Sequence, residues 1–244
     1  MKVKNLLFHF QKTVEWSLVA KCACLVFLAL YVFVHGGMFS WFVWFIASLW
    51  FFYSENIERR SYKYSYGVYV ILLFLYGINI KNSVFGDIIF FFLASFLLAL
   101  WVGLIRFFFK ENEIIMDVFH SILIFLSLLF SLLFPTFFSI VFASISTGML
   151  VYEHLSMRKF SWRPRMMLAS IVLGLFMCEL LLITQLLSLH VIALTGIMSL
   201  AVLVIRNLLV AHFSGTLTQH LLFQNIIIFI TACIILFATG QWVI

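Results

Sequence analysis

Charged residues are scarce in this chain: Asp, Glu, Lys and Arg make up 10% of its 244 residues, whereas 65% are hydrophobic. Soluble domains carry about 25% charged residues, because their surfaces face water. A soluble domain of this size cannot hide so much apolar surface. In the hydrocarbon core of a bilayer, by contrast, side chains that face lipid are expected to be apolar. The composition therefore excludes a single soluble domain and indicates an integral membrane protein.

Cysteine is also scarce, and its positions do not suit a metal site. The thiols lie inside apolar runs, at Cys22, Cys24, Cys178 and Cys233. Zinc sites space their Cys and His ligands in characteristic pairs, and no such spacing occurs here. We therefore expect free thiols within the membrane, with no metal ion and no other cofactor.

Apolar runs separated by charges and turn signals predict nine membrane-spanning helices. A helix needs roughly 20 apolar residues to cross the hydrocarbon core. Pro135 divides one long apolar stretch because proline interrupts helices, whereas the break near Ser188 and His190 has weaker signals. The predicted spans are residues 16–35, 38–53, 66–80, 87–109, 115–134, 136–153, 166–187, 190–210 and 220–241. The fold expected is an all-α polytopic helix bundle, forming a single integral membrane domain over residues 1–244.

The distribution of basic residues predicts an orientation with the N-terminus in the cytoplasm and the C-terminus outside. With nine spans, nearly all Lys and Arg residues fall in loops on the side of the N-terminus, and only Lys81 falls on the opposite side. Cytoplasmic loops are rich in Lys and Arg, and adding or losing one span would destroy this separation. Because the basic residues are spread over short loops, we expect no nucleic-acid partner. The short spans suit a thin bilayer, such as a bacterial inner membrane or the endoplasmic reticulum.

Polar residues recur at an offset of 99 or 100 residues. The matched pairs include Arg59 with Arg158, Ser95 with Thr195, Arg106 with Arg206, and His120 with His220. This recurrence predicts a duplicated four-helix unit, residues 14–110 and 114–210, with residues 214–244 as a ninth helix. An even number of helices would make the copies parallel repeats, as in some transporters. Alternatively, hairpins of similar length place charges at similar intervals without a duplication.

Glu179 lies near the middle of the seventh predicted span. A carboxylate at that depth is costly unless it is neutral, paired or facing water. The duplication places Asn79 at the equivalent position of the first half. We therefore predict a polar site near the bilayer midplane, formed by Glu179 and Asn79. The alternative is a protonated Glu179 that hydrogen-bonds to a neighbouring helix for packing alone.

Further polar residues form stripes along predicted helices. Thr195, Ser199 and Arg206 share one helical face, and His120, Ser127 and Ser131 share another. Together with Arg106 and His220, these residues are candidates for a substrate or ion path, although anchoring at the membrane interface would explain the arginines equally well. The small residues between Ala143 and Gly148 instead predict close helix packing.

No motif identifies an enzyme. The chain lacks a His-Glu-x-x-His zinc motif and a Walker A motif, so an ATP-driven role would need a separate ATPase chain. We favour a small permease or channel-like translocator. The first alternative is a non-catalytic membrane subunit of a larger complex. The second is an intramembrane enzyme acting on a lipid or lipid-linked substrate, with Glu179 or His220 as acid–base groups. Expected partners are the lipid bilayer and other membrane subunits.

Overall fold

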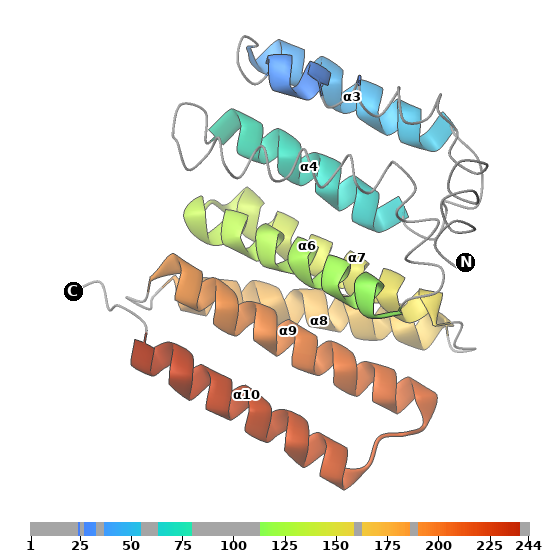
Figure 1. Cartoon of the computed structure of the whole chain (residues 1–244), viewed down its shortest axis with the longest axis vertical. Helices are drawn as coiled ribbons and strands as arrows, with labels where there is room; N and C mark the ends of the chain where they lie inside the picture. The colour runs from blue at the N-terminus through green and yellow to red at the C-terminus, as the bar shows by residue number, and fades with distance from the viewer. Residues whose placement is uncertain are drawn as a thin grey trace, which may run out of the picture. The chain divides into compact units, whose positions relative to one another are not determined.

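The computed structural model is all-α over the residues that it describes, which are residues 24, 27–32, 37–54, 63–79, 113–158, 163–185 and 190–239. The helices labelled in Figure 1 are α3 (Met38–Ser54), α4 (Lys63–Asn79), α6 (Glu113–Leu133), α7 (Phe137–Met157), α8 (Arg163–Thr184), α9 (Val191–Ser214) and α10 (Gln219–Thr239). Each coincides with one predicted span, and the helical residues 27–32 lie within the first. The fourth predicted span, 87–109, lies outside the described residues.

Three helices, α7, α8 and α9, are long and apolar enough to cross a membrane. Shorter apolar stretches of 10–17 residues lie within α3, α4, α6 and α10. These lengths and compositions indicate membrane association. The total of nine spans remains a prediction.

The break between α6 and α7 is fixed by local capping after Pro135. Thr136 Oγ1 accepts a hydrogen bond from Ser139 N at 3.2 Å, and Ser139 Oγ accepts one from Thr136 N at 3.1 Å. This reciprocal capping box satisfies backbone donors that the first helical turn leaves without partners. The helix boundary predicted at Pro135 is confirmed.

The break between α8 and α9 is also confirmed. The α8 helix ends at Thr184, and His190 caps the start of α9, with its Nδ1 accepting a hydrogen bond from Ile192 N at 3.3 Å. At the other end of α9, Gly215 adopts a left-handed conformation with φ of 71°. Glycine takes this conformation without steric cost, which ends the helix.

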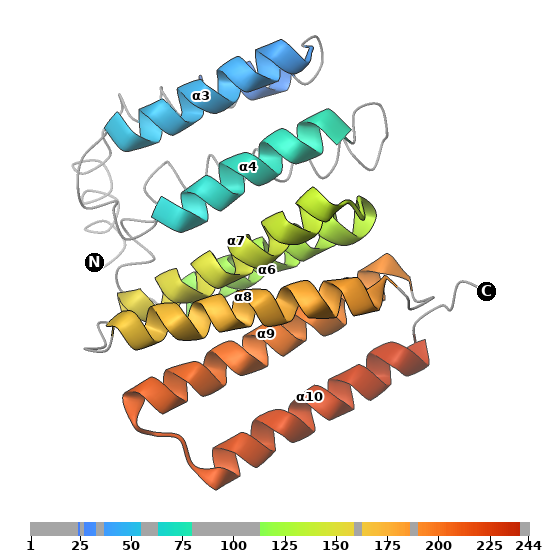
Figure 2. The ribbon, with the colours of Figure 1, turned by 180° about the vertical axis from the view of Figure 1, so that it is seen from behind.

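The chain divides into two compact units. Unit 1 comprises residues 1–57 and 69–116, and it contains α3 and most of α4. These two helices lie side by side in Figures 1 and 2. They touch where Gly77 meets the ring of Trp41, because a Cβ on Gly77 would stand 2.5 Å from the indole. The rings of Phe45 and Phe74 also meet, with centroids 5.2 Å apart.

Unit 2 comprises residues 58–68 and 117–244, and it contains most of α6 and all of α7, α8, α9 and α10. Of the apolar window in α7, 67% is buried, against 33% in α8 and in α9. The α7–α8 contact is made by small residues, since a Cβ on Gly148 would stand 2.9 Å from the carbonyl oxygen of Ser170. The close packing predicted for the stretch that ends at Gly148 is confirmed. Figures 1 and 2 show α10 alongside α9 at the edge of this unit.

Candidate functional site

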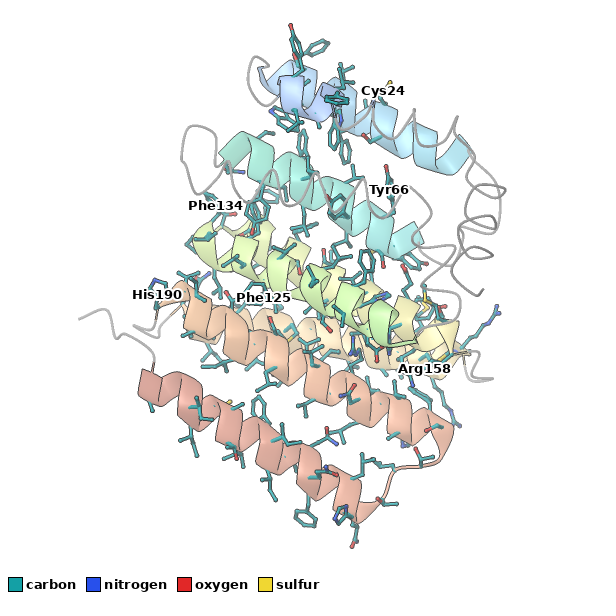
Figure 3. The ribbon with its side chains drawn as sticks, viewed as in Figure 1. Cys24, Tyr66, Phe125, Phe134, Arg158 and His190 are labelled. Carbon is teal, nitrogen blue, oxygen red and sulfur yellow. The ribbon has the colours of Figure 1, made fainter. Side chains whose placement is uncertain are left out.

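Charged and polar side chains of unit 2 gather at the end of the bundle that Arg158 marks in Figure 3, opposite the end that His190 marks. The α4 and α6 helices start at this end, α7 finishes there, and α9 runs toward it. We call the group the ionic cluster; its members are Ser65 of α4, Asp117 and His120 of α6, Glu153 and His154 of α7, Arg158 just after α7, and Arg206 of α9.

Glu153 of α7 caps the start of α4. Its Oε2 accepts a hydrogen bond from Ser65 N at 2.8 Å, and its Oε1 accepts one from Ser65 Oγ at 2.7 Å. The first N–H groups of a helix have no partner within the helix, and the helix dipole favours an anion beside them. Both residues are 1% exposed. The N-terminal end of α4 therefore stabilises the buried Glu153 carboxylate, which in turn caps that helix.

His120 completes the first half of the ionic cluster. Its Nε2 lies 3.2 Å from Ser65 Oγ and 3.8 Å from Glu153 Oε1, and the side chain is fully buried. Because the Ser65 hydroxyl donates its proton to Glu153, its oxygen is left to accept a hydrogen bond from the imidazole. This arrangement favours the His120 tautomer that carries its proton on Nε2.

His154, Asp117 and Arg158 form the second half. His154 Nδ1 lies 3.3 Å from Asp117 Oδ1, and Arg158 Nη2 lies 3.7 Å from Asp117 Oδ2. The His154 side chain is 1% exposed, whereas that of Asp117 is 34% exposed. Asp117 thus connects a buried histidine with the surface of the molecule.

The two halves meet through their histidines. The rings of His120 and His154 are T-shaped to each other, with centroids 5.6 Å apart and planes at 78°. Each imidazole therefore has a carboxylate on one side and the other imidazole beside it. Such His and carboxylate chains within a membrane bundle are typical of proton relays.

Arg206 brings a buried positive charge to the same end. The residue is 4% exposed, and its Nε and Nη1 atoms have no hydrogen-bond partner within the described part of the chain. Asp117 attracts the guanidinium and Arg158 repels it. Burial of the guanidinium is costly, and the negative charge of Asp117 offsets part of that cost.

Four of the predicted path residues are buried in unit 2. His120 and Arg206 belong to the ionic cluster, and Thr195 and Ser199 are buried on the same helix as Arg206. The hydroxyl of Thr195 donates to Val191 O at 2.7 Å, whereas Ser199 Oγ has no hydrogen-bond partner among the described residues. The predicted polar face of α9 is thus a buried face.

The structure does not bring the other predicted residues into the ionic cluster. Glu179 of α8 and His220 of α10 are exposed. Asn79 of α4 is also exposed, and its Nδ2 donates to Leu75 O of the same helix at 2.8 Å. Arg106 lies outside the described residues.

Sequence reasoning missed Ser65, Asp117, Glu153 and His154. All four fall within or next to the loops predicted to face the cytoplasm, where polar residues are expected in any membrane protein. Their positions at the same ends of successive helices were the signal that could have grouped them.

Within the ranges that the structure describes, no group of three or more His, Cys, Asp or Glu side chains could hold a metal ion. Comparisons with known protein families, curated proteins and solved structures gave no match.

Proposed function

We propose that the protein is a small multi-pass permease whose transport is coupled to protons held by the ionic cluster. The observation that carries this proposal is the pair of buried imidazoles, His120 and His154, each beside a carboxylate and in contact with each other. An imidazole can accept a proton on one ring nitrogen and release one from the other, so two imidazoles in contact can pass a proton between them.

The charges of the ionic cluster support this role. Asp117 and Glu153 supply two negative charges, and Arg158 and Arg206 supply two positive charges. With both histidines neutral, these charges sum to zero, and one added proton would leave the ionic cluster with a single positive charge. A site that gains a single positive charge in this way suits reversible proton binding inside an apolar bundle.

Three further helix positions of unit 2 carry buried hydroxyl groups outside the ionic cluster. Ser131 of α6, Thr147 of α7 and Ser199 of α9 are buried, and their hydroxyls have no hydrogen-bond partner among the residues described. They lie at different positions along their helix axes, and Ser131 is near the end of α6 that is opposite the ionic cluster. Unsatisfied hydroxyls inside a bundle offer binding positions to water or a polar substrate.

The remaining features of the proposal follow from the sequence. Nine spans, with the N-terminus in the cytoplasm, would place the Arg158 end of unit 2 on the cytoplasmic side. The ionic cluster would then face the inner mouth of the permease. A bacterial inner membrane suits the short spans.

The geometry gives less support to an intramembrane enzyme. In a Ser–His–acid relay, the acid holds the ring nitrogen of the histidine that does not face the serine. Here Glu153 instead accepts the Ser65 hydroxyl proton and lies 3.8 Å from His120 Nε2, the nitrogen that faces Ser65. The Ser65 hydroxyl is also committed to a carboxylate rather than poised as a nucleophile.

The test is proton flux through the purified full-length protein in liposomes of phosphatidylethanolamine and phosphatidylglycerol. A pH-sensitive dye inside the liposomes reports proton entry after a potassium diffusion potential is imposed. His120→Gln and His154→Gln should each lower the flux at least about tenfold, because neither side chain then titrates. His220→Gln is the matched control, since His220 is exposed on α10 and should leave the flux unchanged.

Two outcomes would reject the proposal. One is flux from the wild-type protein no greater than from empty liposomes. The other is equal flux in the wild type and in both cluster variants. If the first outcome coincides with a stoichiometric partner chain in mild-detergent purification, the non-catalytic subunit hypothesis takes its place.

A further inference from the structure

The α8 helix has an exposed apolar face with one acidic residue in it. Its residues follow one another at intervals of four, three, four and three: Leu168, Val172, Leu175, Glu179 and Leu182. The four apolar side chains are each more than 50% exposed. This face points away from the small residues with which α8 packs against α7, because Ser170 and Gly174 are buried.

Glu179 is surrounded on this face by apolar side chains. Its neighbours one turn away, Leu175, Phe176, Leu182 and Ile183, are all exposed large hydrophobic residues. Within the described residues Glu179 has no hydrogen bond or ion pair. At a rise of about 1.5 Å per residue, Glu179 lies roughly 4 Å along the helix axis from the middle of the apolar segment 166–187. A carboxyl group at that depth needs a partner.

The spacing indicates what kind of partner fits. Intervals of three and four residues are those of a two-helix seam, in which alternate positions are named a and d. Val172 and Glu179 occupy a positions, whereas Leu168, Leu175 and Leu182 occupy d positions. β-Branched residues at a with leucine at d favour two parallel strands, and a single polar residue at a fixes their register. A parallel partner with the same spacing is a second copy of the same helix.

We propose that α8 forms a parallel, two-fold symmetric interface with α8 of a second copy of this chain, in which the two Glu179 side chains hydrogen-bond to each other. Two copies inserted in the same orientation place Glu179 at the same depth. At a two-fold interface, each residue near the axis meets its own counterpart. A protonated carboxyl group both donates and accepts, so Glu179 is complementary to itself.

This interface is independent of the proposed permease function, since Glu179 lies outside the ionic cluster. A helix of a different protein would have to supply a matching donor at the same depth. The experiment below distinguishes that partner from a second copy.

Cysteine cross-linking in native membranes tests the interface. Each of the native cysteines of the full-length chain is replaced by serine, and one cysteine is introduced, as Leu175→Cys or as Met167→Cys. Both positions are exposed, but Leu175 lies on the seam whereas Met167 lies at the flank of the same face. With a membrane-permeant oxidant, Leu175→Cys should form a disulfide-linked dimer and Met167→Cys should not, because disulfides need Cα atoms within about 7 Å.

A second pair of variants tests the role of the carboxyl group. In the Leu175→Cys background, Glu179→Gln should keep the cross-linked fraction, because the amide also donates and accepts. Glu179→Leu should lower that fraction at least about fivefold, the effect expected when one interhelical hydrogen bond is lost. Thermal unfolding in detergent shows whether each variant remains folded.

Three outcomes would overturn the proposal. These are cross-linking of equal yield at both positions, no cross-linking at Leu175→Cys in a folded protein, and a cross-linked product that contains a different chain. Unchanged cross-linking in Glu179→Leu would overturn the role of the carboxyl group.

Discussion

Gly148 of α7 and Gly174 of α8 bring two helix backbones into direct contact. A Cβ on Gly148 would stand 3.8 Å from Gly174 Cα, and one on Gly174 would stand 2.9 Å from the carbonyl oxygen of Ser144. In lipid, helices associate through such close packing, because the hydrophobic effect does not drive them together. This contact holds α7, which supplies Glu153 and His154 to the ionic cluster, against α8.

Gly148→Ala is expected to destabilise the protein. The added methyl group would meet the Ser170 carbonyl at 2.9 Å, so α7 and α8 must separate, at a cost of about 1–3 kcal/mol. Gly67→Ala in α4 is the control, because nothing lies within 4 Å of its Cβ position. Alanine there should raise stability slightly, since it is the better helix former. Thermal unfolding in mild detergent checks both, and a similar shift in both variants contradicts the packing argument.

The stability of Glu153 variants should follow the number of hydrogen-bond acceptors that each side chain still offers to Ser65. Glu153→Ala leaves the buried Ser65 N–H without a partner, and we expect a loss of about 1–3 kcal/mol. Glu153→Gln keeps one acceptor oxygen and should lose less. Ser65→Ala removes the hydroxyl bond but keeps the backbone bond, with a loss of about 1 kcal/mol. The same unfolding assay measures the order, and an Ala variant as stable as the wild type would refute the capping role.

Arg206→Met should separate function from stability. The guanidinium Nε and Nη1 make no hydrogen bonds within the described residues, so a flexible apolar side chain should leave the unfolding temperature unchanged or higher. The ionic cluster loses one of the positive charges that disfavour a proton on His154, so this imidazole should bind a proton more readily. Proton flux near neutral pH should therefore rise, by up to about tenfold, because the site is protonated more often.

The pH dependence of proton flux in the Arg206→Met variant shows whether removing the guanidinium strengthens or weakens proton binding. A proton that is held more tightly leaves at higher pH, so the flux profile should move toward alkaline pH. A shift toward acidic pH, or a lost fold, would contradict the electrostatic argument. The liposome assay, repeated over a pH series, measures this shift.

Gly77 and Trp41 in unit 1 should be energetically coupled. Gly77→Ala places a methyl group 2.5 Å from the indole, which we expect to cost about 1–3 kcal/mol. Trp41→Phe provides a smaller ring, so the double variant should be more stable than the sum of the two single effects predicts. Additive losses in thermal unfolding would argue against a direct contact.

The positions of the helices could be predicted from the sequence because hydrophobicity and helix breakers act locally. Pro135 and His190 separate consecutive helices as expected, and each labelled helix coincides with a predicted span. For the contact between Gly148 and Gly174, the sequence predicts close packing at Gly148 but not the partner helix, since a stretch of small residues does not specify what packs against it. Which helices pair depends on packing between residues far apart in the chain.

The candidate site was harder to predict because charges at helix ends have two explanations. Glu153 and His154 resemble residues that simply leave the membrane, and only the fold reveals that both are buried. The sequence repeat paired His120 with His220, yet the first is fully buried and the second is exposed. Conversely, the depth of Glu179 in its predicted span does not indicate whether its side chain faces the bundle or the lipid.

The hydrogen bonds between Ser65 and Glu153 join positions 88 residues apart. During synthesis, the whole of α4 is therefore translated well before the carboxylate that caps it. Until α7 follows, the first turn of α4 has to rely on water or lipid headgroups for its amide groups. Formation of the early helices and assembly of the ionic cluster are thus separate events, and a truncated chain that ends before residue 153 would carry α4 without its cap.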